Sequence, residues 1–389
     1  MSPQNPFFFI IVYFIAILSA FFIHRKIKPD IYVTRYETID GLRGFLALGV
    51  FIHHSALWYQ FIKTGVWNLV QSNIYNQFGG TSVSFFFMIT SFLFVTKLLN
   101  SEKGQFNWLI FFKNRIFRLF PMYYAALIVI IIIVMIKSNW QIQSGWYPFL
   151  TQIKHWVWFS LVTIPDINNL KDTFLINAGV TWSLPYEWFF YFSLPLLALL
   201  MIKKPKLIYL IIGLAFIFIF CYKRGGYVET DYFFISFLGG AIAPFLIKYT
   251  NLKANIYTKL KSYLGSLIII ACLILICQFK YSMNIYCIVL SSIIFTIIAL
   301  GNSLFGVLKK PQMRLLGDIS YSTYLLHGII LYIAFNFVFS HEKLIHFTDI
   351  EYSFLIFSIT PIVVLISYIT YSYIEKPGMS IGKKLNDIV

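Results

Sequence analysis

The sequence predicts an all-α polytopic membrane protein, and three observations support this fold class. Of the 389 residues, 59% are hydrophobic and 12% are charged, whereas soluble domains contain about 25% charged residues. Apolar runs of roughly the 17 to 25 residues that a helix needs to cross a bilayer recur along the chain. These runs are uninterrupted, whereas the strands of a transmembrane β-barrel would give alternating segments of about ten residues.

Eleven transmembrane helices are predicted from these runs. They lie near residues 7–23, 41–59, 80–99, 119–136, 181–202, 206–222, 231–250, 263–279, 283–305, 319–339 and 352–374. The first run is preceded by MSPQNP, which has no Lys or Arg, and is followed by HRKIKPD. This charge order is the reverse of that in a secretory signal peptide, so we expect a retained helix.

The net charge of +16 is explained by membrane topology rather than by nucleic-acid binding. About 22 of the 31 Lys and Arg residues fall in six segments on one side of the predicted membrane: 24–40, 97–118, 203–206, 248–262, 306–318 and 375–389. The positive-inside rule makes this side cytoplasmic, with the N-terminus outside and the C-terminus inside. The four Cys residues lack CxxC or His-Cys spacing, which indicates buried apolar side chains and predicts neither a metal site nor a disulfide.

The second predicted helix contains DGLRGFLALGVFIHH, residues 40–54, which places ionisable side chains in an apolar run. At about 100° per residue, Arg43 and His54 fall within roughly 20° of the same face, about 16 Å apart along the axis. Asp40 shares this face, whereas His53 points roughly 80° away from Arg43. Because the span starts at the cytoplasmic boundary, we expect His54 about halfway through the bilayer. An ionisable residue at that depth indicates a functional site, with a structural hydrogen bond to a neighbouring helix as the alternative.

The spacing of Arg43 and His54 limits the chemistry, because groups about 16 Å apart cannot both touch one small reacting centre. They can hold one long substrate, with an anionic head at Arg43 and a reactive end at His54. Burial without an acidic partner keeps His54 neutral and able to accept a proton from a hydroxyl. Asp40 is predicted to be the N-cap of this helix, a role compatible with i+3 pairing to Arg43.

Polar residues also mark the entries to the fourth and fifth spans. The fourth is preceded by FFKNRIFRLFPMYY, in which Pro121 suits the first turn of the span. Lys113, Arg115 and Arg118 in this loop are either a topology signal or a phosphate site. The two Arg residues are three apart and can share a helical face for bidentate contact. The fifth span begins with TWSLPYEWFFYF, so Glu187 lies a turn or two inside the membrane and needs a partner or a wet cavity.

The last two spans carry the remaining polar groups. LLGDISYSTYLLHGIIL places His327 about nine residues into the tenth span, after Tyr321 and Tyr324. The sequence supports a packing role and a functional site equally for these polar groups. The eleventh span ends in YIEKPG. There Glu375 and Lys376 are predicted to form an interfacial pair before a proline stop.

Together these segments resemble the acyltransferase 3 family of bacterial membrane proteins, which acylate surface polysaccharides and other extracytoplasmic acceptors. The resemblance covers residues 36–378. Four motifs carry it: the Arg-x10-His helix at Arg43 and His54, the RxxR loop at Arg115 and Arg118, WSLPYEWFFY with Trp182, Ser183 and Glu187, and ISYSTYLLHG with Tyr321, Tyr324 and His327.

The resemblance implies a ten-helix acyltransferase core, with one extra N-terminal transmembrane helix. The expected domains are an N-terminal helix and basic linker (1–35), the acyltransferase domain (36–378) and a short cytoplasmic tail (379–389). The implied reaction transfers an acyl group, most simply acetyl from acetyl-CoA, to a hydroxyl of a surface glycan such as O-antigen or of a glycolipid. Acyl-CoA is then a co-substrate, no cofactor is permanently bound, and the expected location is the bacterial inner membrane.

The resemblance also implies roles for individual residues. The expected catalytic residues are His54, Arg43 and Glu187, and the expected donor-binding residues are Arg43, Lys113, Arg115 and Arg118. Supporting roles are expected for Asp40, Trp182, Ser183, Tyr321, Tyr324 and His327. Whether His54 acts as a base or carries the acyl group transiently stays open. The expected partners are the acyl-CoA, the glycan or glycolipid acceptor and membrane lipids, with no nucleic acid.

A transporter or flippase for a glycan or small anionic solute is the competing class of function. Such proteins also combine many spans with intramembrane ionisable residues. Transporters frequently contain two related halves, and the sequence has no visible internal repeat. A purely structural scaffold would leave the alignment of Arg43 and His54 without a purpose.

Overall fold

The computed structural model describes residues 3, 5–27, 36–101, 106–161, 163–201, 206–224, 230–249 and 254–385. Within these residues the chain is helical and has no β-strand beyond one isolated bridge. Seven helices there are long and apolar enough to cross a membrane, which confirms the predicted all-α polytopic fold. Parts of the predicted basic segments, residues 28–35, 102–105, 203–205, 250–253 and 386–389, lie outside the described residues, as does the side chain of Cys221.

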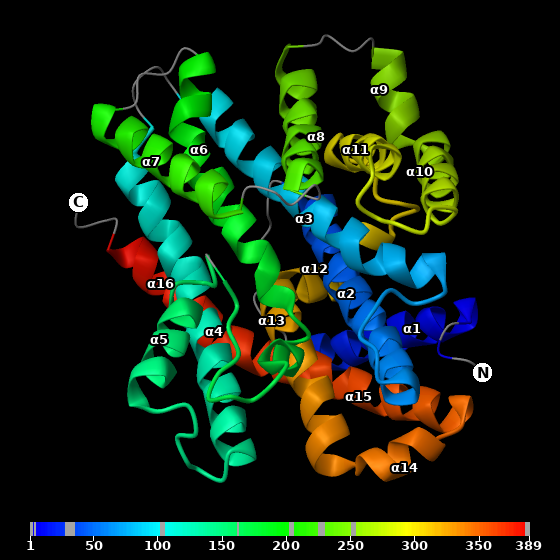
Figure 1. Ribbon diagram of the computed structural model, residues 1–389. Coiled ribbons are helices and arrows are strands. Elements are labelled where there is room, and N and C mark those ends of the chain that lie inside the picture. The colour runs from blue at the N-terminus through cyan, green and yellow to red at the C-terminus, as the bar shows by residue number, and fades with distance from the viewer. Residues whose placement is uncertain are drawn as a thin grey trace. The chain divides into compact units, whose positions relative to one another are not determined.

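Each of the predicted spans coincides with a helix (Figure 1). These helices are α1 (Pro6–Ile27), α2 (Glu37–Thr64), α3 (Asn73–Asn100), α4 (Trp108–Lys137), α6 (Leu184–Leu200), α7 (Leu207–Arg224), α8 (Thr230–Tyr249), α10 (Tyr263–Ile276), α11 (Ile285–Ala299), α13 (Ser320–Ile333) and α15 (Asp349–Thr370). The shorter elements are α5 (Trp146–Val157), α9 (Ala254–Lys261), α12 (Pro311–Asp318), α14 (His341–His346), α16 (Lys376–Lys384), the 3₁₀ segments η1 (Thr173–Asn177), η2 (Val180–Ser183) and η3 (Val307–Lys309), and the π segments η4 (Ala334–Val338) and η5 (Tyr371–Glu375).

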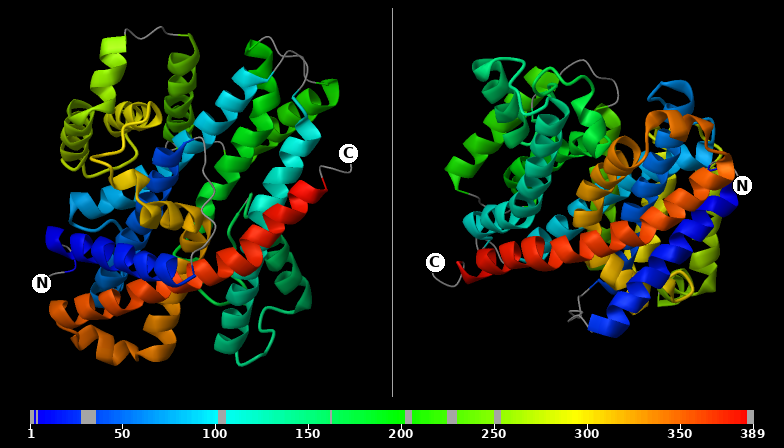
Figure 2. Two further views of the ribbon diagram at one scale, coloured as in Figure 1. Left: turned by 180° about the vertical axis from the view of Figure 1, so that it is seen from behind. Right: turned by 90° about the horizontal axis from the view of Figure 1, so that it is seen from below.

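The chain divides into two compact units, and neither is a continuous stretch of sequence. The first unit contains Met1–Val95 and Glu229–Tyr368, and the second contains Thr96–Val228 and Ile369–Val389. In the first unit α2 packs against α1, α12 and α13, and α1 lies beside α15, where the rings of Phe8 and Phe357 stack 5.5 Å apart (Figure 2). In the second unit α6 packs against α7, and α4 packs against η5 and α16.

Glycines bring α2 and α12 into close contact within the first unit. A Cβ atom added at Gly317 of α12 would lie 1.9 Å from the carbonyl oxygen of Asp40, and one added at Gly41 of α2 would lie 2.0 Å from that of Leu308. A Cβ added at Gly44 would lie 2.7 Å from Leu316 Cβ. Only glycine permits backbone contacts this close. The start of α2, which carries Asp40 and Arg43, is therefore held by direct contact with α12 and η3.

We expect Gly317→Ala to destabilise the protein by about 1 to 3 kcal/mol or more. The added methyl group would overpack a contact with backbone atoms, which cannot move aside locally. Gly65→Ala is the control, since its Cβ would meet open space. It adds only the cost of a left-handed conformation at φ 71°, about 1 to 2 kcal/mol. Thermal unfolding in nanodiscs measures both variants. A Gly317→Ala protein as stable as the wild type would contradict the close packing of α2 and α12.

The beginning of α4 corrects the predicted loop. The helix starts at Trp108 because the side chain of Asn107 accepts a hydrogen bond from Ile110 N at 3.0 Å and caps it. Lys113, Arg115 and Arg118 consequently lie within a helix and not in a loop, and Pro121 lies in the helix interior instead of its first turn. A proline in the interior deprives the carbonyl four residues earlier of its N–H donor.

The predicted proline stop after the eleventh span is also wrong. The helical backbone passes from α15 through the π segment η5 into α16, and Pro377 lies in the first turn of α16. The fixed φ of proline is compatible with the first turn of α16. Gly378 and Gly382 of α16 pack against Pro121 and Phe117 of α4. This packing holds η5 against α4 in the second unit.

Candidate active site

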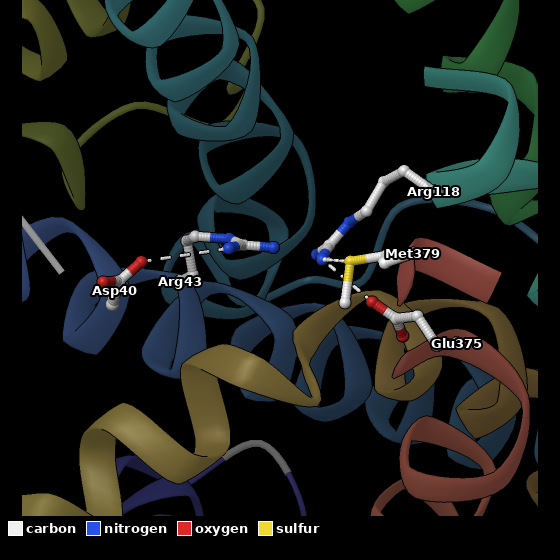
Figure 3. Close-up of polar contacts among 5 residues, drawn as sticks. All are labelled: Asp40, Arg43, Arg118, Glu375 and Met379. Carbon is white, nitrogen blue, oxygen red and sulfur yellow. Dashed lines mark hydrogen bonds and ion pairs between the residues drawn. The ribbon is translucent and has the colours of Figure 1, made fainter. Parts of the chain in front are cut away.

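The polar residues at the start of α2 form an ion pair. Arg43 Nη1 lies 3.9 Å from Asp40 Oδ1, at the predicted i+3 spacing (Figure 3). Asp40 is not the N-cap, because α2 begins one turn earlier at Glu37 and its N-cap, Tyr36, makes no side-chain capping bond. The predicted pairing is therefore confirmed and the predicted capping role is wrong. Both side chains remain partly exposed.

His54 lies against a second histidine from a distant part of the sequence. Its Nδ1 atom is 2.9 Å from Nε2 of His327 in α13, and the two rings stack at 5.0 Å with an interplanar angle of 26°. His327 is fully buried, and its Nδ1 atom lies 2.9 Å from the carbonyl oxygen of Thr323. The structure thus brings together two of the predicted site residues, one from each of two separate motifs.

This chain of contacts determines which nitrogen of each neutral ring carries hydrogen. The Thr323 carbonyl can only accept, so His327 Nδ1 must donate to it. Neutral His327 then presents an unprotonated Nε2, to which His54 Nδ1 donates. The remaining nitrogen, His54 Nε2, carries a lone pair. His54 is only partly buried, so this arrangement produces a base whose basic atom is fixed by its neighbours.

His53 has a different environment from His54. Its Nδ1 atom lies 2.7 Å from the carbonyl oxygen of Tyr75 in α3, to which it donates. Its ring packs directly on Gly79, where an added Cβ would lie 2.7 Å from His53 Nε2. His53 therefore joins α2 to α3.

Aromatic rings surround the histidine pair. Trp67 stacks nearly parallel to His54 at 6.3 Å, and Tyr324 lies 6.3 Å from His327. Trp58, one turn after His54, packs against Trp67 and is 3% exposed. Its indole N–H has no acceptor among the residues that the structure describes, so it is a buried donor. Aromatic rings thus form much of the surroundings of the histidine pair.

The second unit contains a buried ion pair that joins α4 to η5. Arg118 Nη2 lies 3.2 Å from Oε1 of Glu375, whose side chain is fully buried, and the same guanidinium contacts Met379 Sδ (Figure 3). The predicted interfacial pairing of Glu375 with Lys376 is wrong, because η5 carries Glu375 toward α4. Arg118 was predicted to bind phosphate, and in this structure a carboxylate already occupies part of its guanidinium.

Glu187 and Arg115 meet through a tyrosine in the same unit. The Tyr191 hydroxyl donates to Glu187 Oε1 at 2.7 Å, and it also interacts with Arg115 through a side-chain hydrogen bond. Tyr191 lies one turn beyond Glu187 on α6 and is 1% exposed. Glu187 therefore has the partner that its position in the membrane required.

The remaining predicted residues lie outside these clusters. Lys113 Nζ donates to the Leu385 carbonyl at 2.8 Å, which joins α4 to the end of α16. Ser183 donates to the Val180 carbonyl at 3.3 Å, and the ring of Trp182 lies 6.1 Å from that of Tyr186. Tyr321 is partly buried on α13.

Sequence reasoning missed Glu375, Tyr191 and Trp67 as parts of these clusters. Tyr191 was detectable, because a tyrosine four residues after an intramembrane carboxylate lies on the same helical face. Glu375 was not, since its partner Arg118 is 257 residues away in sequence.

The fold and these clusters define a class of protein: a multi-pass helical membrane protein with a pair of contacting histidines between α2 and α13. The model of the acyltransferase 3 family, described as an acyltransferase domain, matches residues 36–372. The chain belongs to this family of membrane acyltransferases. No curated protein and no solved structure shows a significant match to it.

Proposed function

We propose that the protein transfers an acyl group, most simply acetyl, from a cytoplasmic acyl-CoA to a hydroxyl of a cell-surface polysaccharide or lipid-linked glycan. Family membership supports acyl transfer. The single observation that carries the chemical proposal is the His54–His327 contact, because it leaves an unprotonated nitrogen in an aromatic, membrane-embedded setting. The proposal includes the bacterial inner membrane as location, an external N-terminus, a cytoplasmic C-terminus and residues 36–378 as the catalytic domain.

In the proposed reaction His54 Nε2 takes the proton of the acceptor hydroxyl while the oxygen of that hydroxyl attacks the carbonyl carbon of the thioester. The C–S bond breaks, the ester forms, and the proton passes from His54 to the departing thiolate to give free CoA. His327 accepts from His54 Nδ1 throughout, which favours the charge that develops on His54. In a relay, the same Nε2 atom would carry the acyl group, and trapping an acyl-enzyme would identify that route.

We propose that Arg43, Lys113, Arg115 and Arg118 bind the phosphates of the donor. A guanidinium has five N–H donors, so Arg118 can contact a phosphate while it still holds Glu375. The tyrosine-bound Glu187 and the residues Trp182 and Ser183 are proposed to contribute on the acceptor side, because they lie at the predicted external end of α6.

His327 is proposed to be a positioning residue for His54. We expect His327→Leu to lower kcat about 10- to 100-fold, the range typical of groups that orient a functional histidine, and to leave KM nearly unchanged. His327→Gln should retain more activity, because its amide oxygen can accept from His54 Nδ1. The loss in the leucine variant should also change the pH profile of kcat/KM, since a His54 ring without its acceptor samples both tautomers. Equal activity of the Leu and Gln variants would contradict this role.

Mass spectrometry of surface glycans tests the function in cells. A strain that lacks the gene should lose an acyl-sized mass increment from its glycans, and a complemented strain should regain it. Identical glycan masses in the two strains would contradict the proposal. The mass of the increment distinguishes acetyl from a larger acyl group.

A further inference from the structure

A cavity of about 360 Å³ lies in the first unit, apart from the histidine pair. The starts and ends of several elements line it: Tyr36, Glu37, Thr38, Ile247, Tyr257, Lys261, Ala299, Leu300, Gly301 and Lys309. Most of these residues belong to segments that the positive-inside rule assigns to the cytoplasmic side. Its volume is within the range of small-molecule sites, about 300 to 1,000 Å³.

The charges around this cavity favour an anion. Lys261 and Lys309 contribute two positive charges to the lining, and Glu37 contributes one negative charge. Glu37 Oε1 is bound by Arg314 Nη1 from α12 at 3.2 Å. Because the one carboxylate is already neutralised by an arginine, the lining has a net positive charge.

The backbone on either side of Lys261 is held by one buried side chain. Asn302, which is fully buried, donates from Nδ2 to the carbonyl oxygens of Leu260 at 2.8 Å and Ser262 at 3.0 Å, on either side of Lys261. Gly301, at φ 107°, leaves space for the lysine stem, because an added Cβ would lie 3.0 Å from Lys261 Cε. The ammonium lies 4.2 Å from the centre of the Tyr257 ring. These contacts preorganise a cation at the cavity.

We propose that this cavity binds the phosphate group of a small molecule. Lysine is a point-charge ligand for phosphate, and Tyr36 and Tyr257, which also line the cavity, offer aromatic contacts to the group that bears the phosphate. Two ligands would bring such a phosphate. One is the nucleotide end of the acyl-CoA donor, and this choice depends on the proposed function. The other is the headgroup of an anionic phospholipid, and this choice does not depend on it. A bound donor would have to extend from the cavity to His54. Thr38, which lines the cavity, lies about 24 Å before His54 along the axis of α2, a separation that a long donor such as an acyl-CoA can span.

The test uses the full-length protein in nanodiscs and two double variants of equal charge. Lys261→Gln/Lys309→Gln removes the lysines of the cavity, and Lys259→Gln/Lys310→Gln removes neighbouring exposed lysines that do not line it. Calorimetry with coenzyme A in phosphatidylcholine nanodiscs measures the nucleotide source. Native mass spectrometry in nanodiscs that contain phosphatidylglycerol counts the retained anionic lipids.

We expect the cavity variant to bind one of these two ligands at least about tenfold more weakly than the wild type, which is the effect of losing one charge-assisted hydrogen bond. The control variant should bind both ligands with wild-type affinity. Loss of coenzyme A binding identifies the nucleotide, and loss of retained lipid identifies the headgroup. Unchanged binding of both ligands, or equal loss in both variants, overturns the proposal. Ester formation by the wild type is measured separately. If the wild type makes no ester but still binds a phosphate group through these lysines, the proposed function is contradicted and the proposed phosphate site stands.

Discussion

Replacing His54 with alanine is expected to lower the rate of acyl transfer by about 10² to 10⁴, the usual contribution of a positioned general base. The variant should still fold, because His327 stays bonded to Thr323, but the buried His327 Nε2 loses its donor, at a cost of about 1 to 3 kcal/mol. Release of free CoA thiol, measured with purified protein and a glycan acceptor, gives the rate. Arg43→Ala should instead raise KM for the donor if Arg43 binds its phosphates.

The control for this experiment is the adjacent histidine. His53→Ala removes the donor to the Tyr75 carbonyl and should cost about 1 to 3 kcal/mol of stability. The rate per folded molecule should fall much less than in the His54 variant, because the His53 ring lies 5.1 Å from the His54 ring but its own Nδ1 atom is bound to the Tyr75 carbonyl. Wild-type rates in the His54 variant, or equal loss in both variants, would contradict the assignment of the base to His54.

The second large effect concerns the stability of the second unit. Arg118→Ala is expected to destabilise the protein by about 3 to 5 kcal/mol, because it removes the ion-pair partner of a fully buried carboxylate. The double variant Arg118→Ala/Glu375→Leu should recover most of this loss, since replacing a buried ion pair with apolar residues is often neutral. Unfolding of the purified protein by heat or denaturant measures both variants.

The double variant also separates the structural and the proposed donor-binding roles of Arg118. If Arg118 contacts donor phosphates, the double variant should be stable and still bind coenzyme A more weakly than the wild type. Normal donor affinity in this stable variant would restrict Arg118 to its contact with Glu375. A single variant as stable as the wild type would contradict the buried ion pair itself.

The sequence predicted those features of the fold that depend on local pattern. Apolar length located the helices, and seven of those that the structure describes are long and apolar enough to cross a membrane. Helical periodicity predicted the Asp40–Arg43 pairing, which the structure contains, and placed His53 and His54 on different faces of α2, which have different neighbours. These predictions succeed because residues three, four or eleven apart on one helix have a fixed relative direction.

Other features required the tertiary structure. Pro121 and Pro377 resembled helix boundaries, yet one lies inside α4 and the other begins α16. A proline in an apolar run usually marks a helix boundary, but here the packing of α16 on α4 lets the helical backbone continue past it. Helical periodicity contains no information about such packing. The contact of His54 with His327 also joins residues 273 apart. The two motifs identified each histidine, but no spacing rule predicted that they touch.

Reconstituted transfer tests the central claim most directly. Purified protein in proteoliposomes would receive an acyl-CoA with an isotopically labelled acyl group, together with unacylated glycan from the deletion strain. We predict one labelled ester per modified hydroxyl, equimolar release of CoA thiol, and loss of both in the His54→Ala protein. Donor-independent movement of the glycan across the membrane, with no ester and no thiol release, would contradict acyl transfer and favour a transporter.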